Sequence, residues 1–184
     1  MTCIVAVRDK RGVVMGGDSC GAGDNGWARA AFKRPKVFRN GAFVIGYTDS
    51  FRMGQLLEFK LEPPTPPRRD ADLHGFMVAD FAEQVRAVEK AGGYTKIENG
   101  VEVGGAFIVA VRARIFLFSG AYAVLEPNEP FVAVGCGESF ALGALRALSP
   151  RMSAQARCAV ALQVAAASSG GVMPPFHFER TAAR

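Results

Sequence analysis

Short apolar runs separated by turn residues predict β-hairpins in the first part of the chain. Residues 3–8 form one such run, and after a charged turn residues 13–15 form the returning strand. Residues 36–38 and 42–46 predict a second hairpin, because the Asn-Gly pair between them is a strong turn signal. Between the two hairpins, the glycine-rich and polar residues 20–28 predict a loop.

Four longer stretches carry apolar residues at the spacing of a helix that buries one face. The first stretch stops at residues 63–67, which include four prolines, and proline cannot continue a helix. The second stops at a pair of glycines. The predicted helices are residues 50–62, 73–91, 138–148 and 153–167.

One five-residue segment occurs twice. Residues 108–112 repeat the Ile-Val-Ala-Val-Arg of residues 4–8, and residues 115–118 then continue into another apparent hairpin. A further apolar strand is predicted at 131–134. The order is therefore strands, two helices, strands, two helices. This order predicts one α+β domain over residues 1–184, with two antiparallel sheets face to face and helices on both outer faces.

Composition and charge narrow the class of protein. The chain has 184 residues, 49% of them hydrophobic and 21% charged, which suits one globular domain. Its formal charge is +5, but the basic residues within 29–39 match no nucleic-acid-binding module, so we expect no nucleic-acid partner. No apolar run approaches the roughly 20 residues of a membrane span, and the N-terminus lacks the pattern of a signal peptide. We therefore expect a cytoplasmic protein without membrane contact.

The metal-binding residue types are few and scattered. The two histidines, His74 and His177, are far apart in sequence, and the cysteines have no Cys-x-x-Cys spacing. A structural zinc site needs such paired ligands. We expect reduced cysteines and neither a metal nor another cofactor.

Thr2 is the residue that suggests chemistry, because it directly follows Met1 and begins a strand. Threonine is small enough for Met1 to be removed, which would leave an α-amine and a hydroxyl on one residue. An α-amine has an ordinary pKa of about 7.7–8.0, which suits a general base. Threonine paired with its own amine is a known nucleophile and base. On position alone, an ordinary strand residue is the favoured alternative.

The sequence around Thr2 resembles the proteasome β-subunit family, and within it the bacterial HslV type. The resemblance covers most of the chain, in five stretches that follow the family's order: residues 2–8, residues 13–18, Lys36-Val37, Gly135-Cys136-Gly137 and Ser169-Gly170-Gly171. It implies a four-layer αββα sandwich of the N-terminal-nucleophile (Ntn) hydrolases and a threonine-type endopeptidase. It also implies a homo-oligomeric ring that acts on peptides or unfolded proteins. Any ATP-dependent unfoldase would be a separate protein, because this chain has no ATP-binding motif.

The resemblance assigns roles to three residues at the nucleophile. Thr2 matches the nucleophile, and Lys36 matches the lysine whose positive charge would lower the pKa of the Thr2 amine and hydroxyl. Asp18 matches the carboxylate that pairs with this lysine. Without the resemblance, Lys36 is one more solvated cation and Asp18 a simple turn residue.

The surrounding positions depart from the family pattern. The backbone N–H that would bind the oxyanion falls on Asp49, where the family has glycine. This carboxylate would be harmful unless it points away or caps the next helix. Cys136 replaces a serine near the nucleophile's amine, and a thiol is a weaker hydrogen-bond partner. Ser169 is retained, whereas Ala166 replaces an aspartate.

Two functions follow from these observations. The first is a threonine peptidase or amidase, which the complete set of Thr2, Asp18 and Lys36 favours. The second is a non-catalytic ring-forming or binding subunit with the same fold, which the altered positions Asp49, Cys136 and Ala166 favour.

Overall fold

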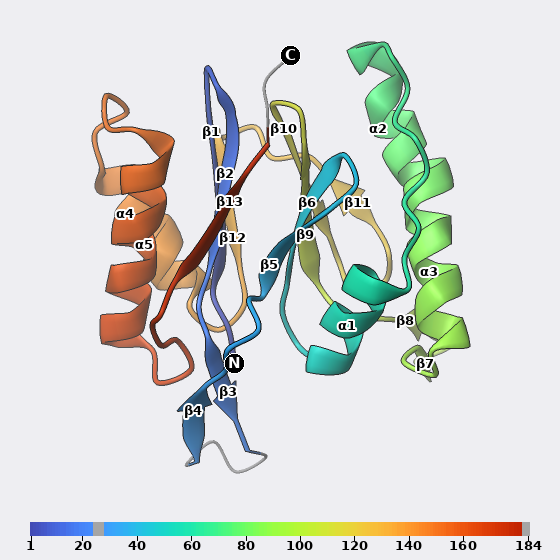
Figure 1. The fold of residues 1–184 in the computed structure, drawn as a ribbon, viewed down its shortest axis with the longest axis horizontal. Coiled ribbons are helices and arrows are strands. Elements are labelled where there is room, and N and C mark those ends of the chain that lie inside the picture. Colours follow the sequence, from blue (N-terminus) through green and yellow to red (C-terminus); the bar gives the residue numbers. More distant parts are fainter. Residues whose placement is uncertain (24–27, 182–184) are drawn as a thin grey trace.

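The computed structural model describes residues 1–23 and 28–181, which form two antiparallel sheets stacked face to face (Figure 1). The first sheet has four strands in the order β12-β1-β2-β13. Their bounds are Phe131–Val134, Ile4–Asp9, Gly12–Gly17 and His177–Arg180. The second sheet has five strands in the order β11-β10-β9-β6-β5. Their bounds are Val124–Leu125, Arg114–Phe118, Phe107–Val111, Phe43–Tyr47 and Val37–Asn40.

Helices cover the outer face of each sheet (Figure 1). The four-stranded sheet is covered by α4 (Glu138–Ala147) and α5 (Ala154–Ser168). The five-stranded sheet is covered by α1 (Phe51–Phe59), α2 (Leu73–Phe76) and α3 (Ala82–Ala91). A 3-10 turn (Asp70–Asp72) precedes α2, and a π-helical turn (Met77–Phe81) joins α2 to α3. The predicted four-layer αββα sandwich is confirmed.

The repeated segment explains how the two sheets pack. Ile4 and Ala6 of β1, together with Ile108 and Ala110 of β9, point into the apolar layer between the sheets. Because side chains alternate along a strand, Val5 faces α4 and α5, whereas Val109 faces the other helices. Both copies therefore have two buried faces, which accounts for their uninterrupted apolar sequence.

Several short strands were not predicted, among them β11 at the edge of the second sheet. The loop expected at 20–28 is wrong for residues Cys20–Ala22, which form β3 and pair with β4 (Arg29–Ala31); residues 24–27 of that loop lie outside the described part. β7 (Lys96–Glu98) and β8 (Val101–Val103) form another hairpin, and β13 adds an edge strand to β2. β4, β7, β8 and β13 are exposed or half-buried, and β3 has only three residues, so none of them carries the long apolar run that marks the central strands.

The helix bounds differ slightly from the prediction. Ser50 lies outside α1 as its N-cap and accepts a hydrogen bond from the Arg52 N–H, and α1 ends at Phe59, before the prolines. No helix within residues 1–23 and 28–181 is long and apolar enough to cross a membrane.

Candidate active site

The backbone of Thr2 is held at the start of β1 by the loop after β12. Thr2 is 4% exposed, and its carbonyl oxygen accepts a hydrogen bond of 3.3 Å from the Gly137 N–H. Gly135 has a φ of +101°, and a Cβ there would lie 2.4 Å from the Thr2 carbonyl oxygen. Glycine at 135 is therefore required for this close approach. The sequence Gly135-Cys136-Gly137 thus positions the backbone of Thr2.

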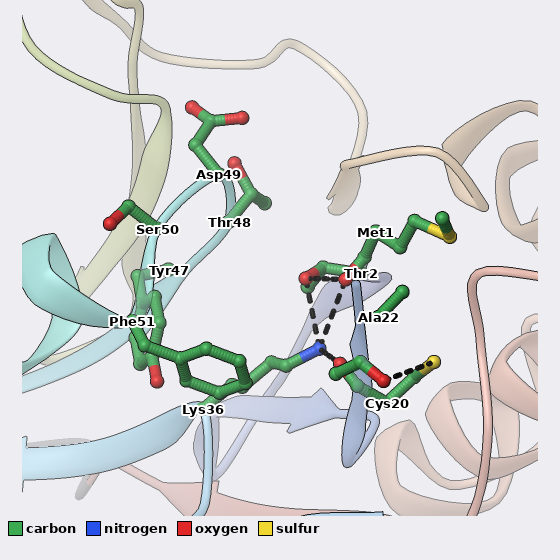
Figure 2. Close-up of a pocket in the computed structure, with 11 residues that line it drawn as sticks. Met1, Thr2, Cys20, Ala22, Lys36, Tyr47, Thr48, Asp49, Ser50 and Phe51 are labelled. Atoms are coloured by element: carbon green, nitrogen blue, oxygen red, sulfur yellow. Dashed lines mark hydrogen bonds between the residues drawn. The ribbon is translucent and has the colours of Figure 1, made fainter. Parts of the chain in front are cut away.

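Lys36 lies just before β5 and reaches the Thr2 hydroxyl from the second sheet. Its Nζ donates to Thr2 Oγ1 at 2.9 Å and to the Cys20 carbonyl oxygen at 2.6 Å (Figure 2). It also donates to Asp18 Oδ1 at 3.0 Å. A longer contact of 3.2 Å reaches the Met1 carbonyl oxygen. Lys36 is 2% exposed, so it is not a solvated surface cation. The positive charge lies in hydrogen-bond contact with the hydroxyl.

Asp18 follows β2 and is fully buried beneath Lys36. Its Oδ1 accepts from the Cys3 N–H at 3.0 Å as well as from Lys36. Its Oδ2 accepts from the N–H groups of Cys20 at 2.7 Å and Met173 at 3.3 Å. A buried carboxylate that accepts this many hydrogen bonds is held in one orientation. Asp18 is therefore a fixed counter-ion rather than a free turn residue.

The Asp49 side chain is turned away from Thr2. Its Oδ2 accepts a 2.7 Å hydrogen bond from the Ala106 N–H, and Figure 2 shows the carboxylate pointing away from the hydroxyl. Asp49 has a φ of +58°, a conformation that glycine adopts without strain and aspartate tolerates. Among the described residues, the Asp49 backbone N–H donates to no protein acceptor. The sequence allowed two harmless arrangements for this carboxylate: it could point away from Thr2 or cap the next helix. The carboxylate points away, and the N-cap of α1 is Ser50 instead.

Cys136 and Ser169 lie on the nitrogen side of Thr2. In the structure this nitrogen is the amide of the Met1–Thr2 peptide bond, so it stands in for the amine that Met1 removal would expose. It lies 3.3 Å from Cys136 Sγ, which in turn lies 3.6 Å from Ser169 Oγ. Ser169 thus reaches the nitrogen of Thr2 only through the thiol. Ala166, half-buried on α5, offers no polar group.

The carbonyl oxygen of Met1 contacts two polar groups of the site. The Thr2 hydroxyl donates to this oxygen, and Lys36 Nζ contacts it as well. Met1 is 46% exposed, whereas Thr2, to which it is bonded, is 4% exposed. Met1 therefore reaches the surface, while the residue that it precedes is buried.

Several residues of the site were not predicted from the sequence. The Cys20 carbonyl oxygen and the Met173 N–H are backbone groups, which carry no residue-type signal. Tyr47 and Phe51 line a cavity of about 90 Å³ beside Thr2 and Lys36. Burial raises the pKa of the Tyr47 hydroxyl to about 12, so Tyr47 is neutral there. Tyr47 ends β6 and Phe51 begins α1. Their place on either side of the Asp49 turn is the sequence signal that could have identified them.

The chain is similar in sequence to a protease subunit. The HslV subunit of an ATP-dependent protease from Desulfovibrio desulfuricans is 28% identical over 153 residues, which cover 80% of this chain and 78% of that protein. No family model matches the chain.

Solved structures share the fold over nearly the whole chain. BPH of Thiobacillus denitrificans in complex with epoxomicin has a TM-score of 0.78 at 19% identity, covering 98% of this chain and 99% of that one. HslV of Trypanosoma brucei has a TM-score of 0.67 at 23% identity, with coverages of 96% and 97%. Anbu of Yersinia bercovieri has a TM-score of 0.68 at 17% identity, covering 98% of this chain and 81% of that one. The chain is therefore similar in sequence to an HslV subunit and shares the fold of BPH, HslV and Anbu.

Proposed function

We propose that the protein is a threonine-type peptidase or amidase whose nucleophile is Thr2 after removal of Met1. The observation that carries the proposal is the buried Lys36 Nζ, which lies 2.9 Å from Thr2 Oγ1 and 3.0 Å from Asp18 Oδ1. A lysine in this position stabilises the alkoxide that forms when the hydroxyl loses its proton. Asp18 holds the lysine in place through the 3.0 Å contact.

The reaction begins with attack of Thr2 Oγ1 on the carbonyl carbon of a peptide bond. The hydroxyl proton passes to the Thr2 α-amine, which then protonates the leaving nitrogen as the C–N bond breaks. This leaves an ester on Thr2. The amine next takes a proton from water, whose oxygen attacks the ester carbon, and the carboxylic acid product departs as Thr2 regains its hydroxyl proton. The Asp49 backbone N–H is our candidate for binding the oxyanion in both steps.

Cys136 and Ser169 are proposed to hold the α-amine in position. With Met1 removed, the amine would lie beside Cys136 Sγ, in place of the amide that lies 3.3 Å away in the structure. Because sulfur is a weak hydrogen-bond partner, the amine would be held less firmly than by a hydroxyl. We therefore expect a slower reaction than a serine at 136 would give.

We further propose a homo-oligomeric ring that takes peptides or unfolded protein as substrate. Support comes from the relative, whose name describes it as a subunit of an ATP-dependent protease. Since this chain has no ATP-binding motif, an ATP-dependent unfoldase would have to be a separate partner.

A non-catalytic ring subunit is the second candidate, and the replaced positions Cys136 and Ala166 favour it. The two candidates differ in what Thr2 does, and two substitutions at this position separate them. Thr2→Ser keeps a hydroxyl, whereas Thr2→Val has the same shape without it; both leave a small second residue, so that Met1 removal is preserved.

The test is hydrolysis of a peptide mixture, followed by mass spectrometry of the products. The peptidase proposal predicts cleavage by the wild type and by Thr2→Ser, and a loss of at least about 100-fold in Thr2→Val. Equal product formation by wild type and Thr2→Val would show that any cleavage comes from elsewhere. No cleavage by a wild type that has lost Met1 would favour the non-catalytic subunit.

A further inference from the structure

The side chain of Asp49 interrupts the pairing of β6 with β9. The regular register ends at Tyr47 opposite Phe107. Thr48 continues the ladder by one bond, because its N–H donates to the Ala106 carbonyl oxygen at 3.2 Å. In a regular antiparallel ladder the Ala106 N–H would donate back to the Thr48 carbonyl oxygen, but it donates instead to Asp49 Oδ2 at 2.7 Å. The carboxylate therefore takes the place of a backbone acceptor.

The Thr48 carbonyl oxygen makes a different contact as a result. It accepts a hydrogen bond of 2.7 Å from the Ser50 N–H, which closes a γ-turn centred on Asp49. The φ of Asp49 is +58°, and a γ-turn with positive φ is rare and strained. Strained backbone persists only where its surroundings fix it. The hydrogen bond from the Ala106 N–H is the contact that fixes the side chain at the centre of this turn.

Thr48 is held firmly on the near side of the turn. It is 3% exposed, and its Oγ1 donates to the Ala106 carbonyl oxygen at 2.8 Å in addition to the backbone bond. Its Cγ2 lies 3.3 Å from the position of a Cβ on Gly135, so Thr48 packs against the loop that positions Thr2. With Thr48 held, the part of the turn that is left to move is the peptide unit that joins it to Asp49.

The orientation of this peptide unit decides where the Asp49 N–H points. The Thr48 carbonyl and the Asp49 N–H belong to one planar unit and point in opposite directions, so a carbonyl that turns to Ala106 turns the N–H by the same angle. Asp49 borders the site together with Thr2 (Figure 2), and its N–H is the donor proposed for the oxyanion. We propose that the Asp49 carboxylate is a positioning group, which accepts the Ala106 N–H and thereby keeps the Asp49 N–H in the direction that the reaction needs. This inference rests on the proposed peptidase function.

The test measures covalent labelling of Thr2 by a peptide epoxyketone with alanine beside its reactive ketone. Attack of Thr2 Oγ1 on the ketone carbon creates an oxyanion, as the proposed reaction does. The protein is produced to begin at Thr2 by cleavage of an N-terminal fusion, so that Met1 removal does not limit labelling. Rates are followed by intact mass over a range of probe concentrations, which gives the maximal rate and the half-saturating concentration separately.

Two substitutions separate the hydrogen bond of Asp49 from the backbone conformation of the turn. Asp49→Asn keeps an oxygen acceptor for the Ala106 N–H and tolerates positive φ, so its maximal rate should stay within about threefold of the wild type. Asp49→Gly adopts positive φ without strain but has no side-chain acceptor. Its maximal rate should fall at least about 10-fold, because loss of one oxyanion donor costs about 100-fold or more. The half-saturating concentration should not change, since the N–H acts on the charge that develops during the reaction.

A control and a crystal structure accompany the rates. The matched control is Asp9→Gly at the far end of β1, where another aspartate carboxylate accepts a backbone N–H, that of Arg11 at 2.8 Å; it should label at the wild-type rate. The crystal structure of Asp49→Gly gives a readout that needs no reaction. Compared with a crystal structure of the wild type, its Ala106 N–H should donate to the Thr48 carbonyl oxygen, and the peptide between residues 48 and 49 should be turned.

Four results would overturn the inference. Asp49→Gly could label at the wild-type rate, or Asp49→Asn could be as slow as Asp49→Gly. Asp49→Gly could be slower only through a higher half-saturating concentration, which would mean that the side chain acts on binding of the probe. Its crystal structure could show an unturned peptide, with water in the place of the carboxylate. Absence of labelling in the wild type and in every variant would instead refute the proposed function, and the crystal structures would then still decide whether the carboxylate holds the turn.

Discussion

Replacement of Glu89 by glutamine should stabilise the protein, and only above about pH 5. Glu89 lies on α3 and is fully buried. Its Oε2 accepts a 2.7 Å hydrogen bond from the Tyr122 hydroxyl, whereas Oε1 has no partner among the described residues. Burial, only partly opposed by the Tyr122 hydrogen bond, raises the pKa of Glu89 from 4.5 to about 7.

The size of the effect follows from this pKa. Between pH 4.5 and 7 the folded protein keeps a proton on Glu89 that the unfolded chain has lost, so stability falls as the pH rises through this range. Each pKa unit is worth about 1.4 kcal/mol, which makes the full cost about 3 kcal/mol above pH 7. Glu89→Gln keeps a neutral, hydrogen-bonding side chain of the same shape and avoids this cost.

The assay is urea unfolding of both proteins from pH 4 to pH 8. The difference in unfolding free energy should be small at pH 4 and should grow in favour of Glu89→Gln by about 3 kcal/mol at pH 8. The control is Glu83→Gln on the same helix, an exposed carboxylate paired with Arg86, which should change stability by less than about 1 kcal/mol at either pH. A difference that does not change with pH, or a variant that is less stable at pH 8, would refute the reasoning.

Three further substitutions test how the site is held. Lys36→Met leaves Asp18 buried without its counter-ion, so urea unfolding should show a loss of about 3–5 kcal/mol; an unchanged stability would mean that the ion pair is dispensable. Gly135→Ala places a Cβ 2.4 Å from the Thr2 carbonyl oxygen and should cost about 1–3 kcal/mol and slow Thr2 labelling. Its control is Gly143→Ala on α4, where a Cβ meets nothing within 4 Å, and the argument fails if the two variants behave alike. Cys136→Ser supplies a stronger partner for the amine and should raise the labelling rate roughly fivefold, the equivalent of about 1 kcal/mol; a lower rate would show that the thiol itself is required.

The central strands could be predicted because their apolar residues indicate a strand with both faces buried. Residues 4–7 and their repeat at 108–111 are apolar on both faces, as strands buried between two layers must be. Strand β13 has no such signal, because His177–Arg180 is half-buried and forms only by pairing with β2, far away in sequence. Pairing over this distance depends on the assembled fold rather than on local pattern.

The candidate site divides in the same way. Thr2, Asp18 and Lys36 were identified through residue types at a family spacing, and the structure brings all three together. The Cys20 carbonyl oxygen that binds Lys36 could not be identified, because every residue carries such a group. The direction of the Asp49 side chain could not be predicted either, since it depends on the Ala106 N–H, which lies just before β9 and far away in sequence. The sequence therefore predicted three residues that lie together at the candidate site, whereas the structure was needed to show which groups orient them.

The central claim is that Thr2 is an accessible and chemically competent N-terminal nucleophile. The most direct test is the intact mass of the purified protein as expressed, measured before and after treatment with a peptide epoxyketone. The residue next to the reactive group of this probe is alanine. We predict loss of Met1 and the mass of one adduct, which is absent in Thr2→Ala. Retained Met1 with no adduct, or an adduct that persists in Thr2→Ala, would contradict the claim.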